Sequence, residues 1–168
     1  PIVQYPAWLG VWPGLLLFLI FAWIENVYTD SVLPSRISQL ILIYSGITWV
    51  GMFLFGKDIW LRHGEAFSLA FGFLARFAPT GKFVPKIKKD GSKENGITLR
   101  PFASGLLHIE IVSVSQMFFV LLLLATVTFD GFTATLPWAN IQNLFQSYLP
   151  NITVVTTLGL ILTGFIFI

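Results

Sequence analysis

Polar side chains that could carry chemistry interrupt an apolar stretch in the second half of the chain. His108 and Glu110 lie in "SGLLHIEIVSVSQMFF", and Ser113 and Gln116 follow Glu110 at steps of three residues. On a helix these three would form one slowly drifting stripe, with His108 about 160° away from Glu110. An ionised carboxylate at the centre of a bilayer costs about 2.5–3.5 kcal/mol, so Glu110 needs a partner, a proton or water. The stripe indicates either a face that handles protons or ions, or a hydrogen-bond network that joins helices.

A second polar group precedes an apolar run that is too short to cross a bilayer. In "KDIWLRHGEAFSLAFGFLARFAPT", Arg62, His63 and Glu65 come before a predicted short helix at 66–77. This helix is expected to be re-entrant or interfacial, with both ends on one side, or else to cross as a short tilted segment; the basic residues favour the first form. Broken helices often point their ends at a bound ion or substrate. A direct ion pair between Arg62 and Glu65 is the structural alternative.

Two further acidic residues lie near the ends of apolar stretches. Glu25 is one turn from the end of the first stretch. It is close enough to reach the membrane surface, or it pairs with a basic residue from another part of the protein. Asp130, in "TVTFDGFTATLPW", is expected at the outer end of the third stretch. Asp followed by Gly favours a turn or a helix end there, and a ligand-binding loop is the alternative.

Composition identifies an integral membrane protein. The 168 residues are 55% hydrophobic and 11% charged, with a mean hydropathy of +0.79. Soluble domains carry about 25% charged residues. The expected partners are therefore the lipid bilayer and further transmembrane helices, from the same protein or from other subunits, and not nucleic acid. The absence of cysteine excludes disulfides and thiolate metal sites within this chain.

Hydropathy predicts an all-α, polytopic transmembrane helix bundle. A spanning helix needs about 20 apolar residues. Four stretches come near that length, and the short helix at 66–77 adds a fifth element. The four predicted spans lie near residues 7–27, 37–55, 102–128 and 152–168. Apolar residues at positions 141, 144, 145, 148 and 149 also predict a short helix on the membrane surface.

Small residues are spaced for close helix contact at two places. Gly10 and Gly14 form a GxxxG pair, and Gly159 with Thr163 forms a weaker pair of the same kind. Such spacing lets two helix backbones approach closely. These pairs indicate that the helices pack into a bundle, and they give no information about activity.

The distribution of charge predicts the orientation in a cell membrane. Nine of the ten Lys and Arg residues lie between Lys57 and Arg100, so the polar loop at 81–101 is expected to be cytoplasmic. The sequence begins at Pro1 and ends within an apolar run. We therefore expect the chain to be a single membrane-embedded portion of a longer multi-pass protein.

Enzyme signatures do not emerge from the sequence. It contains no HExxH, GxSxG, P-loop or dinucleotide-binding pattern. Its two histidines, His63 and His108, lie on different predicted elements and give at most part of a metal site. The sequence assigns no catalytic residue, no metal ligand set and no cofactor.

The stretches "GMFLFGKDIWLRHGEAFSLAFGFLARFAP", "VTFDGFTATLPW" and "AWIENVYTD" resemble a family of many-span prokaryotic membrane proteins often labelled fenitrothion hydrolase. The resemblance covers most of the chain, and the lysine-rich stretch "GKFVPKIKKDGSKENG" departs from it. Members are longer, with many more spans. The label implies hydrolysis of an organophosphate ester, which requires a metal or an activated water. His63, Glu65 and Asp130 are the residues that the label would draw on.

Three functions remain open at this point. One is transporter-like translocation of a solute or ion, with Glu110, His108 and the broken helix at Glu65 along the path. Another is an accessory or structural subunit of a larger membrane complex, in which the same polar groups bind neighbouring helices. The third is membrane-bound hydrolysis, as the family label implies.

Overall fold

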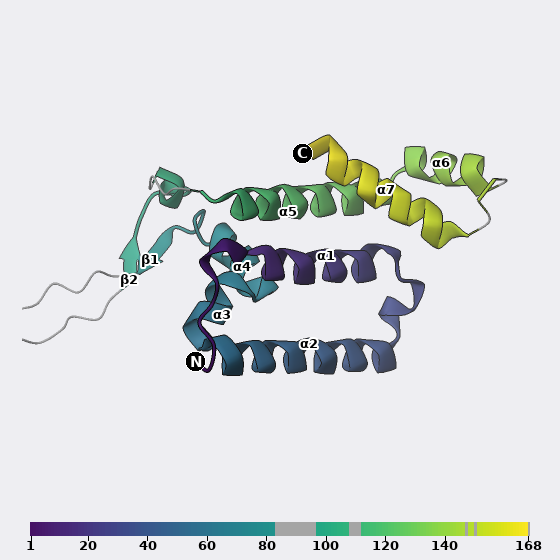
Figure 1. Ribbon diagram of the computed structural model, residues 1–168. Helices are drawn as coiled ribbons and strands as arrows, with labels where there is room; N and C mark the ends of the chain where they lie inside the picture. The colour runs from purple at the N-terminus through teal and green to yellow at the C-terminus, as the bar shows by residue number, and fades with distance from the viewer. Residues whose placement is uncertain (83–96, 108–111, 147, 150, 168) are drawn as a thin grey trace, which may run out of the picture. The chain divides into compact units, whose positions relative to one another are not determined.

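The computed structural model describes residues 1–82, 97–107, 112–146, 148–149 and 151–167 (Figure 1). It divides into two compact units, which are described separately: Pro1–Leu69 with Val112–Ile168, and Ala70–Ile111. The described chain is mostly helical. Three of its helical stretches are long and apolar enough to cross a membrane: Ala7–Val27, Pro34–Phe55 and Val114–Thr133. His108 and Glu110 lie outside the described residues.

The first unit begins with two membrane-length helices joined by a short turn. A 3-10 turn, η1 (Ala7–Leu9), leads into α1 (Trp12–Val27). A second 3-10 turn, η2 (Thr29–Val32), leads into α2 (Pro34–Phe55). A proline lies in the first turn of each helix, where its missing N–H would have no intrahelical partner in any case.

The chain reverses direction after α2 and forms two short helices. α3 (Lys57–His63) follows Gly56, whose φ of +88° lies in the left-handed region that favours glycine. α3 then packs against the last turns of α2. The Trp60 ring lies on Gly51 and stacks on Phe55, with ring centroids 5.9 Å apart. α4 (Ala66–Leu74) begins after a break at Gly64 and Glu65.

The third long helix starts later than the sequence predicted. We expected a span over 102–128, but α5 occupies Val114–Thr133. Ser113 is its N-cap: the Gln116 backbone N–H donates to the Ser113 hydroxyl over 3.3 Å, and the Ser113 N–H donates to the Gln116 side chain over 2.9 Å. This reciprocal capping box fixes the helix start. The three-residue spacing of Ser113 and Gln116 therefore belongs to a cap and not to a polar stripe within a span.

The end of α5 also differs from the expectation for Asp130. The predicted turn at Asp130 and Gly131 is absent, because α5 continues to Thr133 and places Asp130 in its last turns. Threonine hydroxyls bind the carbonyls at this end of the helix: Thr133 donates to the Asp130 carbonyl over 2.7 Å, and Thr135 donates to the Phe132 carbonyl over 2.7 Å. α6 (Leu136–Gln146) follows at once.

The best-packed part of the first unit lies where α5, α6 and α7 (Ile152–Phe167) meet the end of α1. Its core is a cluster of five buried apolar residues, Val27, Phe129, Trp138, Val155 and Leu160. The Phe129 and Trp138 rings meet edge to face at 5.3 Å. Gly159 provides the room for this contact, because a Cβ there would lie 2.5 Å from the Trp138 ring.

The second unit contains a two-stranded antiparallel sheet. β1 (Thr80–Lys82) pairs with β2 (Ile97–Leu99), with Thr80 opposite Leu99. A 3-10 turn, η3 (Ser104–Leu107), follows. The Arg100 guanidinium donates to the carbonyls of Ala78 and Ala75 over 2.9 and 2.8 Å. The strands lie at the two ends of the predicted polar loop, whose central residues 83–96 fall outside the described part.

Candidate functional site

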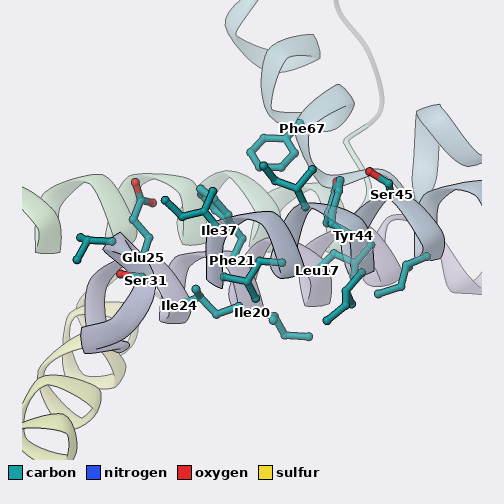
Figure 2. Close-up of a pocket in the computed structure, with 15 residues that line it drawn as sticks. Leu17, Ile20, Phe21, Ile24, Glu25, Ser31, Ile37, Tyr44, Ser45 and Phe67 are labelled. Carbon is teal, nitrogen blue, oxygen red and sulfur yellow. The ribbon is translucent and has the colours of Figure 1, made fainter. Parts of the chain in front are cut away.

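A large apolar cavity lies between α1 and α2 (Figure 2). Its volume is about 550 Å³, which falls within the usual range for ligand pockets. The lining comes from α1, η2, α2 and the start of α4. It consists of Leu17, Ile20, Phe21, Ile24, Glu25, Ser31, Val32, Ile37, Leu40, Ile41, Ile43, Tyr44, Ser45, Ile47 and Phe67. We call it the α1–α2 cavity.

Both walls of the cavity have the spacing of helix-packing faces. On α1 the lining residues are 17, 20, 21, 24 and 25, and on α2 they include a row at 37, 40, 41, 44 and 47, with 43 and 45 beside it. Steps of three and four place such residues on one face of a helix. Helices that pack directly have axes about 8–10 Å apart and interlock these rows. Here the two rows line a cavity instead, so each presents a packing face that the other helix does not fill.

A short segment holds the two spans apart at one end of the cavity. We call it the spacer: α3 and the first turn of α4, residues 57–69. It contacts one glycine on each span. A Cβ on Gly14 of α1 would lie 2.3 Å from the Leu69 side chain, and a Cβ on Gly51 of α2 would lie 2.2 Å from the Trp60 ring. Gly14 and Gly51 therefore allow the spacer, and not the opposite span, to pack closely against each helix.

Aromatic rings continue the spacer into the cavity wall. The Phe67 ring meets Phe21 of α1 at a centroid distance of 5.0 Å and Tyr44 of α2 at 5.4 Å, both edge to face. Edge-to-face pairs at such distances are favourable. Phe67 thus bridges the two spans and closes the cavity at this end.

Glu65 joins the spacer to α2. The Tyr44 hydroxyl donates to its carboxylate, and so do the backbone N–H groups of Phe67, over 3.1 Å, and Ser68, over 2.5 Å. The carboxylate therefore caps the N-terminus of α4, where the helix dipole also favours negative charge. Glu65 is only 6% exposed. All of these contacts act to hold the spacer in place.

The protonation of Glu65 follows from the same contacts. Glu65 lies outside the membrane-length helices. Burial on its own raises the pKa of Glu65, but the hydrogen bonds from Ser68, Tyr44 and Phe67 outweigh burial and bring this pKa below its ordinary value. The residue is therefore ionised at neutral pH and acts as a fixed acceptor.

The other two polar residues predicted beside Glu65 do not join it. In the described part of the chain, no ion pair links Arg62 to Glu65, and Arg62 is exposed. His63 turns its Nδ1 to the Ile59 carbonyl at 3.0 Å, and its ring lies against Tyr5, with centroids 5.2 Å apart. Of this predicted group, only Glu65 contacts the wall of the cavity.

Glu25 lies at the other end of the cavity. Figure 2 shows it with Ser31 on one side, and Tyr44, Ser45 and Phe67 toward the other. Glu25 is exposed, and no described residue donates a hydrogen bond to its carboxylate. It is the single carboxylate among the described residues that line the cavity.

The structure does not bring Asp130 together with His63 and Glu65. The backbone of His63 packs beside Gly14, near the start of α1, whereas the neighbour of Asp130, Phe129, packs with Val27 at its end. These two α1 positions are thirteen residues apart, which corresponds to about 20 Å of helix. Among the described residues, no group of three or more His, Asp or Glu is placed to hold a metal ion. The residues that the hydrolase label would draw on therefore form no common site.

A second apolar cavity, of about 510 Å³, lies between α1, α5 and α7. Trp12, Trp23, Phe118 and Phe165 are among its lining residues. The Trp23 indole N–H donates to the Thr157 hydroxyl over 3.1 Å at its edge. This cavity contains no charged group among the described residues that line it.

Sequence reasoning missed Tyr44 and Phe67. Both lie in stretches that were treated as uniformly apolar. For Tyr44 a signal was present, because tyrosines in membrane proteins concentrate at the interfaces, while Tyr44 lies near the middle of α2. Its hydroxyl therefore needed a partner within the protein.

Comparison with protein-family models, with curated proteins and with solved structures finds no match to this chain.

Proposed function

We propose that this chain is a structural or accessory part of a larger membrane assembly and that the α1–α2 cavity receives a transmembrane helix from that assembly. The observation that carries the proposal is the pair of unfilled packing faces on α1 and α2, held apart by the spacer. A helix placed between them would interlock with both rows.

The exposure of α2 supports the same function. Ile41, which lines the cavity, is 59% exposed, and Phe53, outside it, is 71% exposed. Gly51 is the one residue of α2 that is fully buried. Lipid covers apolar surface of this kind as well as leucine does, and the proposal is that a protein helix takes the place of lipid in the cavity between α1 and α2.

The polar residues support a structural role as well. Glu65 caps α4 and binds Tyr44, and Ser113 and Gln116 cap α5. Groups that handle ions in membrane proteins face a water-filled cavity or one another. Glu65, Ser113 and Gln116 instead complete helix ends, as expected for a scaffold, whereas Glu25 lines the cavity.

Translocation of a solute or ion is a second candidate, favoured by one observation. The α1–α2 cavity has the size of a ligand pocket, with Glu25 at one end and Tyr44 toward the other. Proton or cation flux in proteoliposomes tests this candidate. Flux that Ile20→Trp abolishes, with helix content unchanged, would favour translocation; absence of flux would count against it.

Photo-cross-linking tests the primary proposal. A benzophenone amino acid replaces Ile41 in the cavity or, as the matched control on the same helix, Phe53 outside it, in the full-length protein in its native membrane. We expect the label at 41 to form an adduct with one defined transmembrane segment and the label at 53 to react chiefly with lipid. Lipid adducts alone at both positions would contradict the proposal.

A further inference from the structure

We propose that the helix received by the α1–α2 cavity carries a lysine or arginine that pairs with Glu25. This inference rests on the proposed function and specifies the chemistry of the partner. Among the described residues that line the cavity, most of which are apolar, Glu25 is the only charged one, and it belongs to a membrane-length helix. A carboxylate in that setting requires a counter-charge or water.

The charged residues near this end of the cavity are engaged elsewhere. Arg36, in the first turn of α2, donates to the Gln39 side chain over 3.0 Å. Asp30, in η2, accepts a hydrogen bond of 3.4 Å from the Tyr28 hydroxyl. Neither residue lines the cavity. Within the described part of the chain, no residue supplies a counter-charge to Glu25, which is exposed. A helix that fills the cavity would take the place of water beside this carboxylate, so the occupant itself must bring the counter-charge.

The position of Glu25 sets where the basic residue must lie. Glu25 precedes the end of α1 at Val27 by two residues, so the partner's cation lies about one turn from the end of its helix. Lysine and arginine suit this place, because their aliphatic stems cover apolar surface while the charged head reaches toward the interface. Ile24 and Val32 provide that apolar surface beside Glu25.

Helix docking in nanodiscs tests the inference. The chain contains no cysteine, so Ser45→Cys on the cavity lining accepts a single bimane label. The probes are synthetic leucine–alanine helices with uncharged polar ends, one tryptophan to quench bimane, and Lys, Gln or Glu one turn from one end. We expect the Lys helix to bind about tenfold more tightly than the Gln helix, and Glu25→Gln to remove that difference. Asp30→Asn, an acid at the same end but outside the lining, is the matched control and should leave the preference intact.

Each outcome separates the inference from the function on which it rests. Equal binding of the Lys and Gln helices would overturn the pairing with Glu25 and leave helix docking in place. A Lys preference that survives Glu25→Gln would also overturn it. If no helix quenches the label while brominated lipids do, acyl chains fill the cavity and both proposals fail.

Discussion

The helix pair α5 and α7 packs closely, whereas the pair α1 and α2 lines a half-open cavity. At the first contact Gly159 lies under the rings of Trp138 and Phe129, and Leu160 is buried beside it. At the second, large apolar side chains of α1 and α2 line a cavity, and the glycines Gly14 and Gly51 contact the spacer instead of the opposite span. In a membrane, helix association depends on close van der Waals contact, since lipid is as apolar as leucine. The placement of glycine thus decides which helices meet directly.

The largest expected effect comes from removing the carboxylate that fixes the spacer. Glu65→Ala leaves the Tyr44 hydroxyl and two backbone N–H groups without an acceptor. We expect a loss of about 3 kcal/mol in the free energy of unfolding. Far-UV circular dichroism during SDS unfolding in micelles measures it. Asp58→Ala, at an exposed acid of the same segment, should change the value by less than about 0.5 kcal/mol; an equal loss in both variants would show that Glu65 does not fix the spacer.

Truncation of one apolar residue in each helix pair tests the comparison directly. Leu160→Ala, at a residue only 6% exposed, should cost about 2 kcal/mol, because the cavity that it creates is not filled by neighbours. Ile41→Ala, in the α1–α2 cavity, should cost less than about 0.5 kcal/mol in the isolated chain. The same unfolding assay measures both. Similar losses would mean that the two helix pairs are equally well packed.

Glycine substitution tests the cause of the difference. Gly159→Ala places a methyl group 2.5 Å from the buried Trp138 ring, and we expect a net loss of about 1 kcal/mol after the gain in helix propensity. Gly46→Ala, which meets open space, should instead stabilise α2 by up to about 1 kcal/mol. Opposite signs in thermal unfolding would support the role of Gly159, and a stabilised Gly159→Ala would refute it.

The smallest expected effect is the dependence of spacer stability on pH. The folded-state pKa of Glu65 lies below its unfolded value. Its contribution is therefore complete above the ordinary glutamate pKa of about 4.3 and is lost as the pH falls toward the folded pKa. As the pH falls through this acidic window, the free energies of unfolding of the native chain and of Glu65→Gln should become equal. A constant difference between them at every pH would contradict the assignment.

Hydropathy alone was sufficient to predict the helical class and three membrane-length helices, whereas the fourth predicted span, 152–168, corresponds to α7, a shorter apolar helix. Hydropathy did not predict where the helices begin and end, because single side chains determine those positions. The capping box of Ser113 and Gln116 was legible as an S-x-x-Q pattern, but the long apolar context favoured one continuous helix. The pairing of Tyr44 with Glu65 depends on the reversal at Gly56, which brings the spacer back along α2. No periodicity encodes such a contact, because it arises only after the two segments have folded together. The number of spans, their orientation and the role of Glu110 stay predictions.

The order of residues along the chain has a consequence for biogenesis. Tyr44 and Glu65 are only 21 positions apart, so both partners of this hydrogen bond are made within one short stretch of the chain. The pair can form as soon as α3 has turned back along α2, without waiting for α5 or α7. The counter-charge that we propose for Glu25 would instead arrive with another helix, at assembly.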